Sequence, residues 1–240
     1  MSAIAPETAM VMAAGLGLRM RPLTLNRPKA LVEVGGKALI DHILDRLEVA
    51  GVTRAVVNVH AFADQMEAHL ARRRSPEILI SDERALLLET GGGLKQARAM
   101  LGEDPIWVAN SDYVWREERD DALAMVARAW DPARMDACLI VVPKERTGGF
   151  DTPGDFVRDA SGALKPRGEA TEAPFHCFGV EILDPQRVYA VPESRFSLFQ
   201  VWKAASERGR LFGVVPDGYW MQVGDPASLA AAETWLAEPA

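Results

Sequence analysis

Near its beginning the chain reads Ala9-Met-Val-Met-Ala-Ala-Gly-Leu-Gly-Leu-Arg-Met-Arg-Pro-Leu-Thr-Leu-Asn-Arg-Pro-Lys29, and this segment sets the expectations for the whole fold. Its first six residues form an apolar run that ends at Gly15, as a buried parallel strand does where a turn begins. Gly15 and Gly17 have no Cβ, so backbone N–H groups there can approach an anion closely. Four cations follow within eleven residues: Arg19, Arg21, Arg27 and Lys29. This order is typical of a strand followed by a loop that cradles a polyphosphate.

Two other kinds of phosphate loop are excluded by the residues present. A dinucleotide-binding loop needs a third glycine at position 20, where Met20 stands, and a helix directly afterwards, where Pro22 and Pro28 stand. A Walker loop needs Gly-Lys-Ser/Thr, which the segment lacks. The remaining alternative is an ordinary surface loop with solvated basic side chains.

Strand and helix patterns alternate through the first half of the chain. We expect strands at 9–14, 54–60, 77–81 and 106–109, and helices at 39–50, 64–73 and 92–101. Such alternation predicts a mostly parallel sheet covered by helices on both faces, with ligands at the carboxyl ends of the strands. Asp112 and two glycine-rich loops follow strands, so they are expected to meet at one edge of the sheet.

The second half is less regular. We expect strands at 136–142, 174–183 and 211–215, a hairpin over 156–164 that turns at 159–162, and helices at 198–207 and 226–236, with Asp225 as the cap of the last helix. The fold class predicted is therefore α/β, a Rossmann-like three-layer α/β/α arrangement with a smaller antiparallel lobe that binds a sugar. We expect one domain over 1–240, with a nucleotide-binding half at 9–112 and a sugar-phosphate-binding half at 113–240.

Composition limits the partners. Against 27 Lys and Arg the chain has 34 Asp and Glu, a net charge of −7, which argues against binding to nucleic acid. Cys138 and Cys177 lie far apart among apolar neighbours, which is typical of buried thiols in strands. No signal peptide and no apolar run of about 20 residues is present, so we expect a cytoplasmic protein without a membrane partner.

The segment from Ala13 to Thr24, followed by Pro28-Lys29, resembles the signature of the sugar-1-phosphate nucleotidylyltransferases. The resemblance continues through Leu88-Glu-Thr-Gly-Gly-Gly93, Asn110-Ser-Asp112, Gly154-Asp-Phe156, Phe178-Gly179 and Trp220-Met-Gln-Val-Gly224. Within that family, the run at 88–93 and Asn58-Val-His-Ala61 are most similar to the N-acetylmuramate-1-phosphate uridylyltransferases of cell-wall (peptidoglycan) recycling. The resemblance implies a Rossmann-like fold and transfer of a nucleotidyl group, from UTP, to N-acetylmuramic acid 1-phosphate.

The resemblance also implies a role for particular residues. The nucleotide would be bound by Ala13, Ala14, Gly15, Gly17, Arg19, Lys29, Glu89, Thr90 and Gly91, of which Lys29 would touch the α-phosphate. The sugar phosphate would be bound by Asn110, Gly154, Asp155, Lys165, Gly179 and Glu181, although Lys165 equally fits a solvated hairpin lysine. Asp112 would hold Mg²⁺, and Arg19, Lys29 and Asp112 would act in catalysis.

The chemistry explains these residue types. A sugar-phosphate oxygen is already an anion at neutral pH, so its attack on the α-phosphorus needs no general base; cations and Mg²⁺ must instead align two polyanions and stabilise the developing charge. The lack of a Ser–His–Asp or Cys–His arrangement is therefore expected. His60 and His176 lie in or beside apolar runs, so we predict structural roles for both.

One position departs from the family pattern. Relatives end with Trp-x-Asp-x-Gly, whose Asp is a second Mg²⁺ ligand, but here Gln222 offers only a neutral oxygen. Three outcomes stay open: Asp112 holds the metal with phosphate oxygens and water, Asp225 substitutes, or turnover is weak and the chain is a nucleotide-binding regulatory protein. Guanylyl or thymidylyl transfer to another hexose 1-phosphate is a further alternative. We expect a monomer or a weak homo-oligomer.

Overall fold

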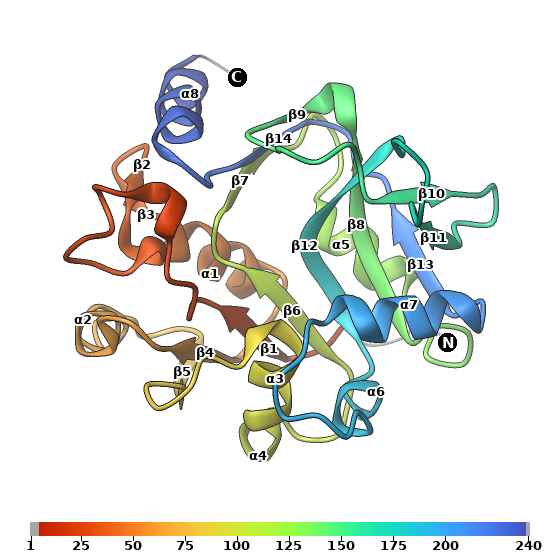
Figure 1. Ribbon diagram of the computed structural model, residues 1–240, viewed down its shortest axis with the longest axis horizontal. Helices are drawn as coiled ribbons and strands as arrows, with labels where there is room; N and C mark the ends of the chain where they lie inside the picture. The colour runs from red at the N-terminus through yellow and green to blue at the C-terminus, as the bar shows by residue number, and fades with distance from the viewer. Residues whose placement is uncertain (1–4, 239–240) are drawn as a thin grey trace.

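A nine-stranded sheet forms the centre of the protein (Figure 1). The computed structural model describes residues 5–238. The strands of this sheet are β1 (Thr8–Met12), β4 (Arg54–Val59), β5 (Glu77–Asp82), β6 (Ile106–Asn110), β8 (Ala137–Pro143), β10 (Phe156–Arg158), β11 (Leu164–Pro166), β12 (Phe175–Leu183) and β13 (Leu211–Val214). Strands β6, β1, β4 and β5 lie side by side and parallel, and β12 continues the sheet antiparallel to β6. The edge of the sheet at the carboxyl ends of β1, β4 and β6 is therefore shared by three loops.

Helices cover both faces of the sheet, as the alternation of apolar runs predicts. One face carries α1 (Leu39–Val49), α2 (Ala63–Leu70) and α5 (Ala122–Ala129), and the other carries α3 (Glu89–Gln96), α4 (Arg98–Leu101), α6 (Gln186–Tyr189) and α7 (Phe199–Glu207). Successive side chains of a strand point to opposite faces, so Ala9 and Val11 join one buried cluster while Met10 joins the other. The three-layer α/β/α prediction is confirmed.

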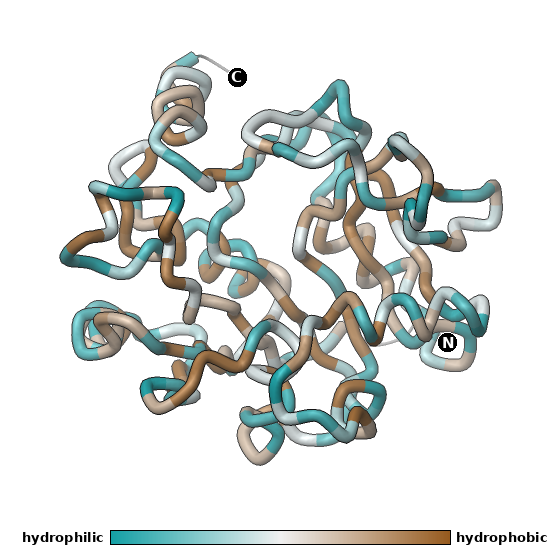
Figure 2. Tube along the Cα trace, viewed as in Figure 1, coloured by the Kyte–Doolittle hydropathy of each residue, from teal (hydrophilic) through white to brown (hydrophobic). Residues whose placement is uncertain are grey.

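Smaller elements close one side of the molecule. They are the three-stranded sheet of β7 (Tyr113–Arg116), β14 (Tyr219–Gln222) and β9 (Thr147–Gly148), the hairpin of β2 (Glu33–Val34) and β3 (Lys37–Ala38), and α8 (Pro226–Ala237). Helix α8 packs against β2 and β14, and a third buried cluster there includes Met20, Val114 and Met221. Figure 2 shows that apolar and polar segments alternate along the trace, with apolar segments in the central strands. Asp225 caps α8 by accepting the Ser228 N–H at 2.8 Å, which confirms its predicted role.

Several local predictions need correction. The helix predicted at 92–101 is two helices, because the chain breaks at Ala97 and α3 begins already at Glu89. Helix α2 spans Ala63–Leu70 and so ends before the predicted limit at 73. Helix α5 was not among the expected helices; it begins after Asp121, whose side chain caps it. Nothing in the sequence pattern indicated β9 and β14, which pair in parallel and make the smaller sheet mixed.

Both cysteines lie in strands as free thiols, Cys138 fully buried in β8 and Cys177 partly buried in β12. Burial raises the pKa of the Cys138 thiol to about 12. Over the described residues, no helix combines the length and the apolar character that crossing a bilayer requires.

Candidate active site

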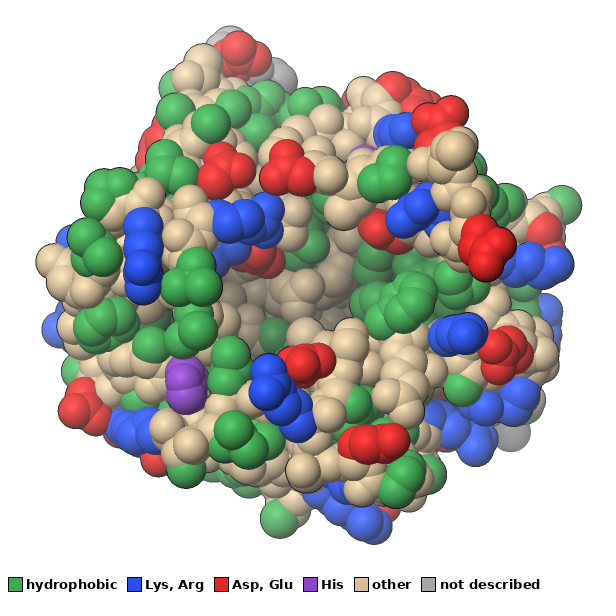
Figure 3. Space-filling model, in the orientation of Figure 1, with side chains coloured by type: hydrophobic (Ala, Val, Ile, Leu, Met, Phe, Trp, Pro, Cys, Tyr) green, Lys and Arg blue, Asp and Glu red, His purple; other side chains and the backbone are tan. Residues whose placement is uncertain are grey.

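A cavity of about 470 Å³ opens at the carboxyl ends of β1, β4 and β6. In the space-filling view the molecule is hollowed at the middle of this face, and Lys and Arg side chains lie along the rim (Figure 3). The lining residues are Met12, Ala13, Ala14, Gly15, Leu16, Gly17, Leu18, Arg19, Lys29, Ala30, Asn58, Glu83, Leu87, Glu89, Thr90, Asn110, Ser111, Asp112 and Gly224. The glycine-rich loop at 15–17, the second glycine-rich segment at 88–93 (the second loop) and Asp112 therefore meet at one edge, as their positions after strands predict.

The loop after β1 lines the cavity, and the N–H groups at its centre have no partner among the described residues. Asn58 Oδ1 accepts the N–H groups of Ala13 and Ala14 at 2.6 and 3.2 Å. Over residues 5–238, no acceptor takes the N–H groups of Gly15, Leu16 and Gly17. Unpaired N–H groups in a turn of this kind attract an anion. The amides available to a phosphate are thus those of 15–17, whereas those of Ala13 and Ala14 are already used.

Gly17 has to be a glycine at this position. Its φ is +60°, and a Cβ there would lie 2.9 Å from Lys29 Cβ and 3.0 Å from Thr24 Cγ2. Thr24 Oγ1 donates to the Gly17 carbonyl at 2.7 Å. The segment at 24–29 therefore packs against Gly17, and this contact places Lys29 next to the glycine-rich loop.

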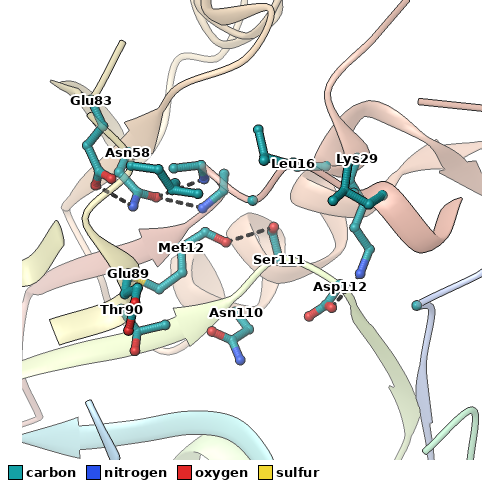
Figure 4. A pocket seen from close by; sticks show the side chains of 18 of the residues that line it. Met12, Leu16, Lys29, Asn58, Glu83, Glu89, Thr90, Asn110, Ser111 and Asp112 are labelled. Atoms are coloured by element: carbon teal, nitrogen blue, oxygen red, sulfur yellow. Dashed lines mark hydrogen bonds and ion pairs between the residues drawn. The ribbon is translucent and has the colours of Figure 1, made fainter. Parts of the chain in front are cut away.

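Lys29 and Asp112 form the central ion pair of the cavity (Figure 4). Lys29 Nζ lies 2.6 Å from Asp112 Oδ2, and the two side chains are only 15% and 19% exposed. Ser111 Oγ donates to the Met12 carbonyl at 2.9 Å and so fixes the segment after β6 against the end of β1. A cation and a carboxylate that lie this close can each be recruited by a ligand of opposite charge.

The motif at 220–224 also reaches the first cavity, which Gly224 lines. Arg19 pairs with Asp151 at 3.2 Å, and a Cβ on Gly224 would lie 3.2 Å from Arg19 Nη2. Gln222 does not line the cavity; its Nε2 donates to the Tyr113 hydroxyl at 3.2 Å. Burial, followed by the charge of Asp112, raises the pKa of Tyr113 well above its ordinary value. Arg19 is thus placed beside the cavity while Gln222 lies behind it.

The second loop is fixed against residues 194–198. Gly91 and Gly92 donate their N–H groups to the Phe196 carbonyl at 2.9 and 3.1 Å, and Thr90 Oγ1 accepts the Leu198 N–H at 2.8 Å. A Cβ on Gly91 would lie 2.2 Å from the Phe196 ring. Glu89 has a φ of +63°, a left-handed conformation that few residues besides glycine adopt without strain. Glu89 and Thr90 line the cavity, whereas Gly91 packs beneath it.

Two further cavities extend the first one. A cavity of about 220 Å³ shares Asn110 with it and is lined by Asn110, Tyr113, Asp155, Phe156, Cys177, Gly179, Phe199 and Trp202. A third, of about 520 Å³, shares Asp155 and Phe199 with the second and is lined by Asp155, Pro166, Arg167, Gly168, Phe199, Lys203, Ser206 and Glu207. The three cavities form one row across the face of the molecule.

Of the residues predicted to bind the sugar, the structure brings Asn110, Asp155 and Gly179 into the second cavity. Gly179 has a φ of +67°, and a Cβ there would lie 2.3 Å from Asn110 Nδ2. Glu181 lies behind the wall, where it accepts the Trp202 Nε1–H at 2.8 Å and where burial raises its pKa well above the ordinary value. Lys165 is exposed on β11 and lines none of the three cavities. Gly154 is buried and lines none of them either.

Asp155 has a partly buried carboxylate at the junction of the second and third cavities. Its Oδ2 accepts the Cys177 N–H at 2.8 Å. Burial raises the pKa of this carboxyl, but the His176 side chain, whose Nδ1 lies 3.8 Å from Asp155 Oδ2, and the hydrogen bond from the Cys177 N–H outweigh burial, so the pKa lies below its ordinary value. His176 packs there against the Phe150 ring, and His60 Nδ1 donates to the Glu83 carbonyl at 2.7 Å. Both histidines thus have structural contacts, in agreement with the sequence.

A metal ion at this site would depend on few protein groups. Within the described chain, no cluster of three or more His, Cys, Asp and Glu side chains could hold one. Asp112 offers a single carboxylate toward the cavity, and Asp225 is engaged as the cap of α8. Mg²⁺ suits such a site because it keeps several waters and binds substrate phosphates with one or two carboxylates.

Known proteins resemble the chain throughout its length. The family described as nucleotidyl transferase matches residues 8–151. The chain is 52% identical over 238 residues to N-acetylmuramate alpha-1-phosphate uridylyltransferase of Caulobacter vibrioides, with 98% of each chain covered. It is 32% identical over 228 residues to the Neisseria meningitidis protein of the same name, covering 94% of this chain and 96% of that one. The inositol-1-phosphate CTP transferase of T. maritima has the same fold, with a TM-score of 0.78 at 17% identity over 98% of each chain.

Proposed function

We propose, from the premise that the chain belongs to the nucleotidyl transferase family, that it transfers the uridylyl group of UTP to N-acetylmuramic acid 1-phosphate and releases pyrophosphate. That the chain is a sugar-1-phosphate nucleotidyltransferase follows from its family and its named relatives. The choice of this substrate pair rests on one observation, the 52% identity that extends over 98% of both chains.

The geometry supports a nucleotide in the first cavity. We assign the β- and γ-phosphates to Arg19 and the unpaired N–H groups of 15–17, and the α-phosphate to Lys29. The base and ribose lie against the second loop, where Glu89 and Thr90 reach the cavity. In this arrangement the half at 9–112 binds the nucleotide, and the half at 113–240 binds most of the sugar phosphate.

The reaction needs alignment more than proton transfer. A phosphate oxygen of the sugar substrate attacks the α-phosphorus, the bond from that phosphorus to the bridging oxygen of the β-phosphate breaks, and pyrophosphate leaves with both electrons of that bond. The nucleophile is already ionised, so the residues need only bring the two anions together and stabilise charge on the five-coordinate phosphorus. Lys29 is placed to do this beside Asp112, and Arg19 holds the leaving group.

Asp112 is the residue that we assign to Mg²⁺. The ion would neutralise phosphate charge and help to orient the α-phosphate. Because Asp112 pairs with Lys29 at 2.6 Å, the metal and the lysine compete for the same carboxylate. Gln222 keeps only its amide oxygen for a cation, since its amide nitrogen donates to Tyr113. We therefore propose that phosphate oxygens and water complete the coordination.

The far end of the cavity row supports a sugar that carries a carboxylate. Arg167 and Lys203 line the third cavity, next to the one that shares Asn110 with the nucleotide site. Arg167 is fixed by hydrogen bonds from its Nε to the Gly154 carbonyl at 2.9 Å and from its Nη1 to the Ala170 carbonyl at 2.8 Å. N-acetylmuramic acid differs from N-acetylglucosamine by a lactyl ether that ends in a carboxylate. Lys203 lies 4.0 Å from Glu207, which lines the same cavity, so the fixed guanidinium of Arg167 is the cation that suits that group.

We further propose that the enzyme acts in the cytoplasm, in the recycling of peptidoglycan sugars, as a monomer or weak homo-oligomer. The location and the process follow from the proposed substrates, UTP and a phosphorylated wall sugar.

The test is pyrophosphate release from each of UTP, GTP, dTTP and CTP with a panel of sugar 1-phosphates, with and without Mg²⁺. We expect release with UTP and N-acetylmuramic acid 1-phosphate, and at least tenfold less with the N-acetylglucosamine analogue. Preference for GTP or dTTP with another hexose 1-phosphate would replace the proposed substrates. Tight nucleotide binding without release from any pair would favour the regulatory alternative.

A further inference from the structure

We propose that Asn58 and Glu83 act as positioning residues that hold the two loops of the nucleotide site at a fixed separation. Their hydrogen-bonded pair, which we call the Asn58–Glu83 bridge, joins the loop after β1 to the loop before α3 (Figure 4). The inference rests on the proposed assignment of both loops to the nucleotide. Neither residue was singled out by the sequence for a role of this kind.

Asn58 holds the loop after β1. It stands near the end of β4, is 2% exposed, and accepts the N–H groups of both Ala13 and Ala14 with Oδ1. Its Nδ2 donates to Glu83 Oε1 at 2.7 Å. Because both ends of the amide have partners of fixed type, its orientation is fixed too.

Glu83 holds the loop before α3. The residue is 2% exposed, and while its Oε1 accepts from Asn58, its Oε2 accepts the Leu88 N–H at 3.2 Å. The backbone of the same residue is fixed as well, since its N–H donates to the Val59 carbonyl at 2.8 Å and its carbonyl accepts from His60. The carboxylate oxygens are thus bonded by an amide and a backbone N–H rather than by a cation.

Gly93 leaves the space that the bridge occupies. A Cβ there would lie 2.6 Å from Glu83 Oε1 and 3.0 Å from Asn58 Nδ2. Glycine is unfavourable within a helix, and Gly93 lies within α3. The third glycine of the run at 91–93 therefore makes room for a polar pair rather than for a ligand.

The bridge matters for the nucleotide because it determines which backbone N–H groups of the loop after β1 remain without a partner. It uses the amides of Ala13 and Ala14, so that the next N–H groups, those of 15–17, lie unpaired in the cavity. It also fixes Leu88, directly before Glu89 and Thr90. A nucleotide that contacts both loops must match their separation, and a rigid support for such contacts lowers the cost of ordering them on binding.

A pair of exchanged residues tests this idea. In Asn58→Asp two carboxylates face each other. In Glu83→Gln the new NH₂ group must face either Asn58 Nδ2 or the Leu88 N–H, both of which are donors, so each single change removes one of the hydrogen bonds that join the two loops. In the double variant the new amide at position 83 donates its NH₂ to the new carboxylate at position 58, and its oxygen accepts the Leu88 N–H. The carboxylate at position 58 still accepts the N–H groups of 13 and 14. We measure Kd for UTP by calorimetry and KM for each substrate, along with the melting temperature.

We expect each single change to weaken UTP binding about 10- to 30-fold, the loss typical of a buried hydrogen bond to a charged group. The double variant should return to within about fivefold of the wild type, although independent losses would multiply to about 100-fold or more. KM for the sugar phosphate should stay within about twofold. The control is Asp136→Asn, which weakens the ion pairs of a fully buried carboxylate with Arg208 and Arg210, outside the three cavities. It should lower the melting temperature and leave UTP binding unchanged.

Wild-type UTP affinity in both single variants would overturn the inference, and so would a double variant as weak as the product of the singles. Equal losses for UTP and the sugar phosphate that follow the melting temperature would show a structural role only. If the wild type binds UTP and the variants give one of these results, the role of the bridge is refuted and the proposed function is not affected. A wild-type chain that binds no UTP refutes the proposed function, and the same titrations with GTP, dTTP and CTP then decide the bridge.

Discussion

Replacing Lys29 by methionine should change metal binding and catalysis in opposite directions. Lys29 neutralises Asp112 at 2.6 Å, so a cation that binds Asp112 must first displace the ammonium. Without the ammonium the carboxylate is free, and a divalent ion should bind more tightly. Catalysis should fall nevertheless, because Lys29 is the cation that we place on the α-phosphate.

The size of both effects follows from the geometry. Unit charges 2.6 Å apart attract by about 6 kcal/mol at an effective dielectric constant of 20 and by about 1.6 kcal/mol in bulk water. The pair is 15% and 19% exposed and lines an open cavity, so we take a value near the lower end, about 2 kcal/mol. That energy corresponds to metal binding about 30-fold tighter in Lys29→Met. Loss of a cation aimed at the transition state costs about 10²- to 10³-fold in kcat.

Titration with Mn²⁺ followed by electron paramagnetic resonance, without nucleotide, measures the first effect, and pyrophosphate release at saturating UTP measures the second. Lys29→Arg is the matched control, since it keeps the charge and should bind Mn²⁺ like the wild type. Unchanged Mn²⁺ affinity in Lys29→Met would refute the competition for Asp112. Unchanged kcat would refute the assignment of Lys29 to the α-phosphate.

Three other substitutions test separate parts of the account. Glu181→Gln should increase stability at alkaline pH. The raised pKa of the buried carboxyl means that the wild type loses up to about 1.4 kcal/mol per pH unit as the pH rises from the ordinary value of 4.5 toward the raised pKa, and urea unfolding at pH 5 and 8 should show this loss in the wild type and not in the variant. Gly179→Ala, with its Cβ 2.3 Å from Asn110 Nδ2, should lower the melting temperature and raise KM for the sugar phosphate at least tenfold, and unchanged kinetics would place the sugar elsewhere. Gln222→Asp should leave Mn²⁺ affinity within about twofold of the wild type, because position 222 does not line the cavity, and binding at least tenfold tighter would show that a carboxylate there completes the metal site with Asp112.

The sequence predicted the layers of the fold because the apolar runs at 9–14 and 55–57 are continuous and end at a glycine and at a polar residue. Buried parallel strands have this pattern regardless of what packs on them. The meeting of Gly15, Gly17 and Asp112 followed from the same reasoning, since all of them come after such strands.

Long-range polar contacts could not be predicted in this way. Asn58 lies 45 residues from Ala13 and Glu83 lies 25 residues from Asn58, and a pattern of apolar residues carries no information about which amide meets which carboxylate. Arg73 shows the same limit. It ends the helix predicted at 64–73, and nothing in the sequence indicated a partner for it, but the side chain is only 13% exposed and pairs with Asp41 and Asp45 of α1.

The glycines at 91–93 show why a motif locates a loop more reliably than it assigns the contacts of each residue. The resemblance placed Gly91 beside the base, but in the structure Gly91 packs under the Phe196 ring, and its N–H donates to the carbonyl of the same residue. Gly93 makes room for Glu83. Which atom fills the space of a missing Cβ depends on segments distant in the sequence, here those at 83 and 196.

A single competition tests the central claim most directly. Equal concentrations of UTP, GTP, dTTP and CTP are mixed with equal concentrations of N-acetylmuramic acid 1-phosphate and N-acetylglucosamine 1-phosphate, and the nucleotide sugars formed with Mg²⁺ are identified by mass spectrometry. The account predicts UDP-N-acetylmuramic acid as the dominant product, at least tenfold over UDP-N-acetylglucosamine. A different base or sugar in the dominant product would contradict the proposed substrates, and no nucleotide sugar from any pair would contradict the proposed activity itself.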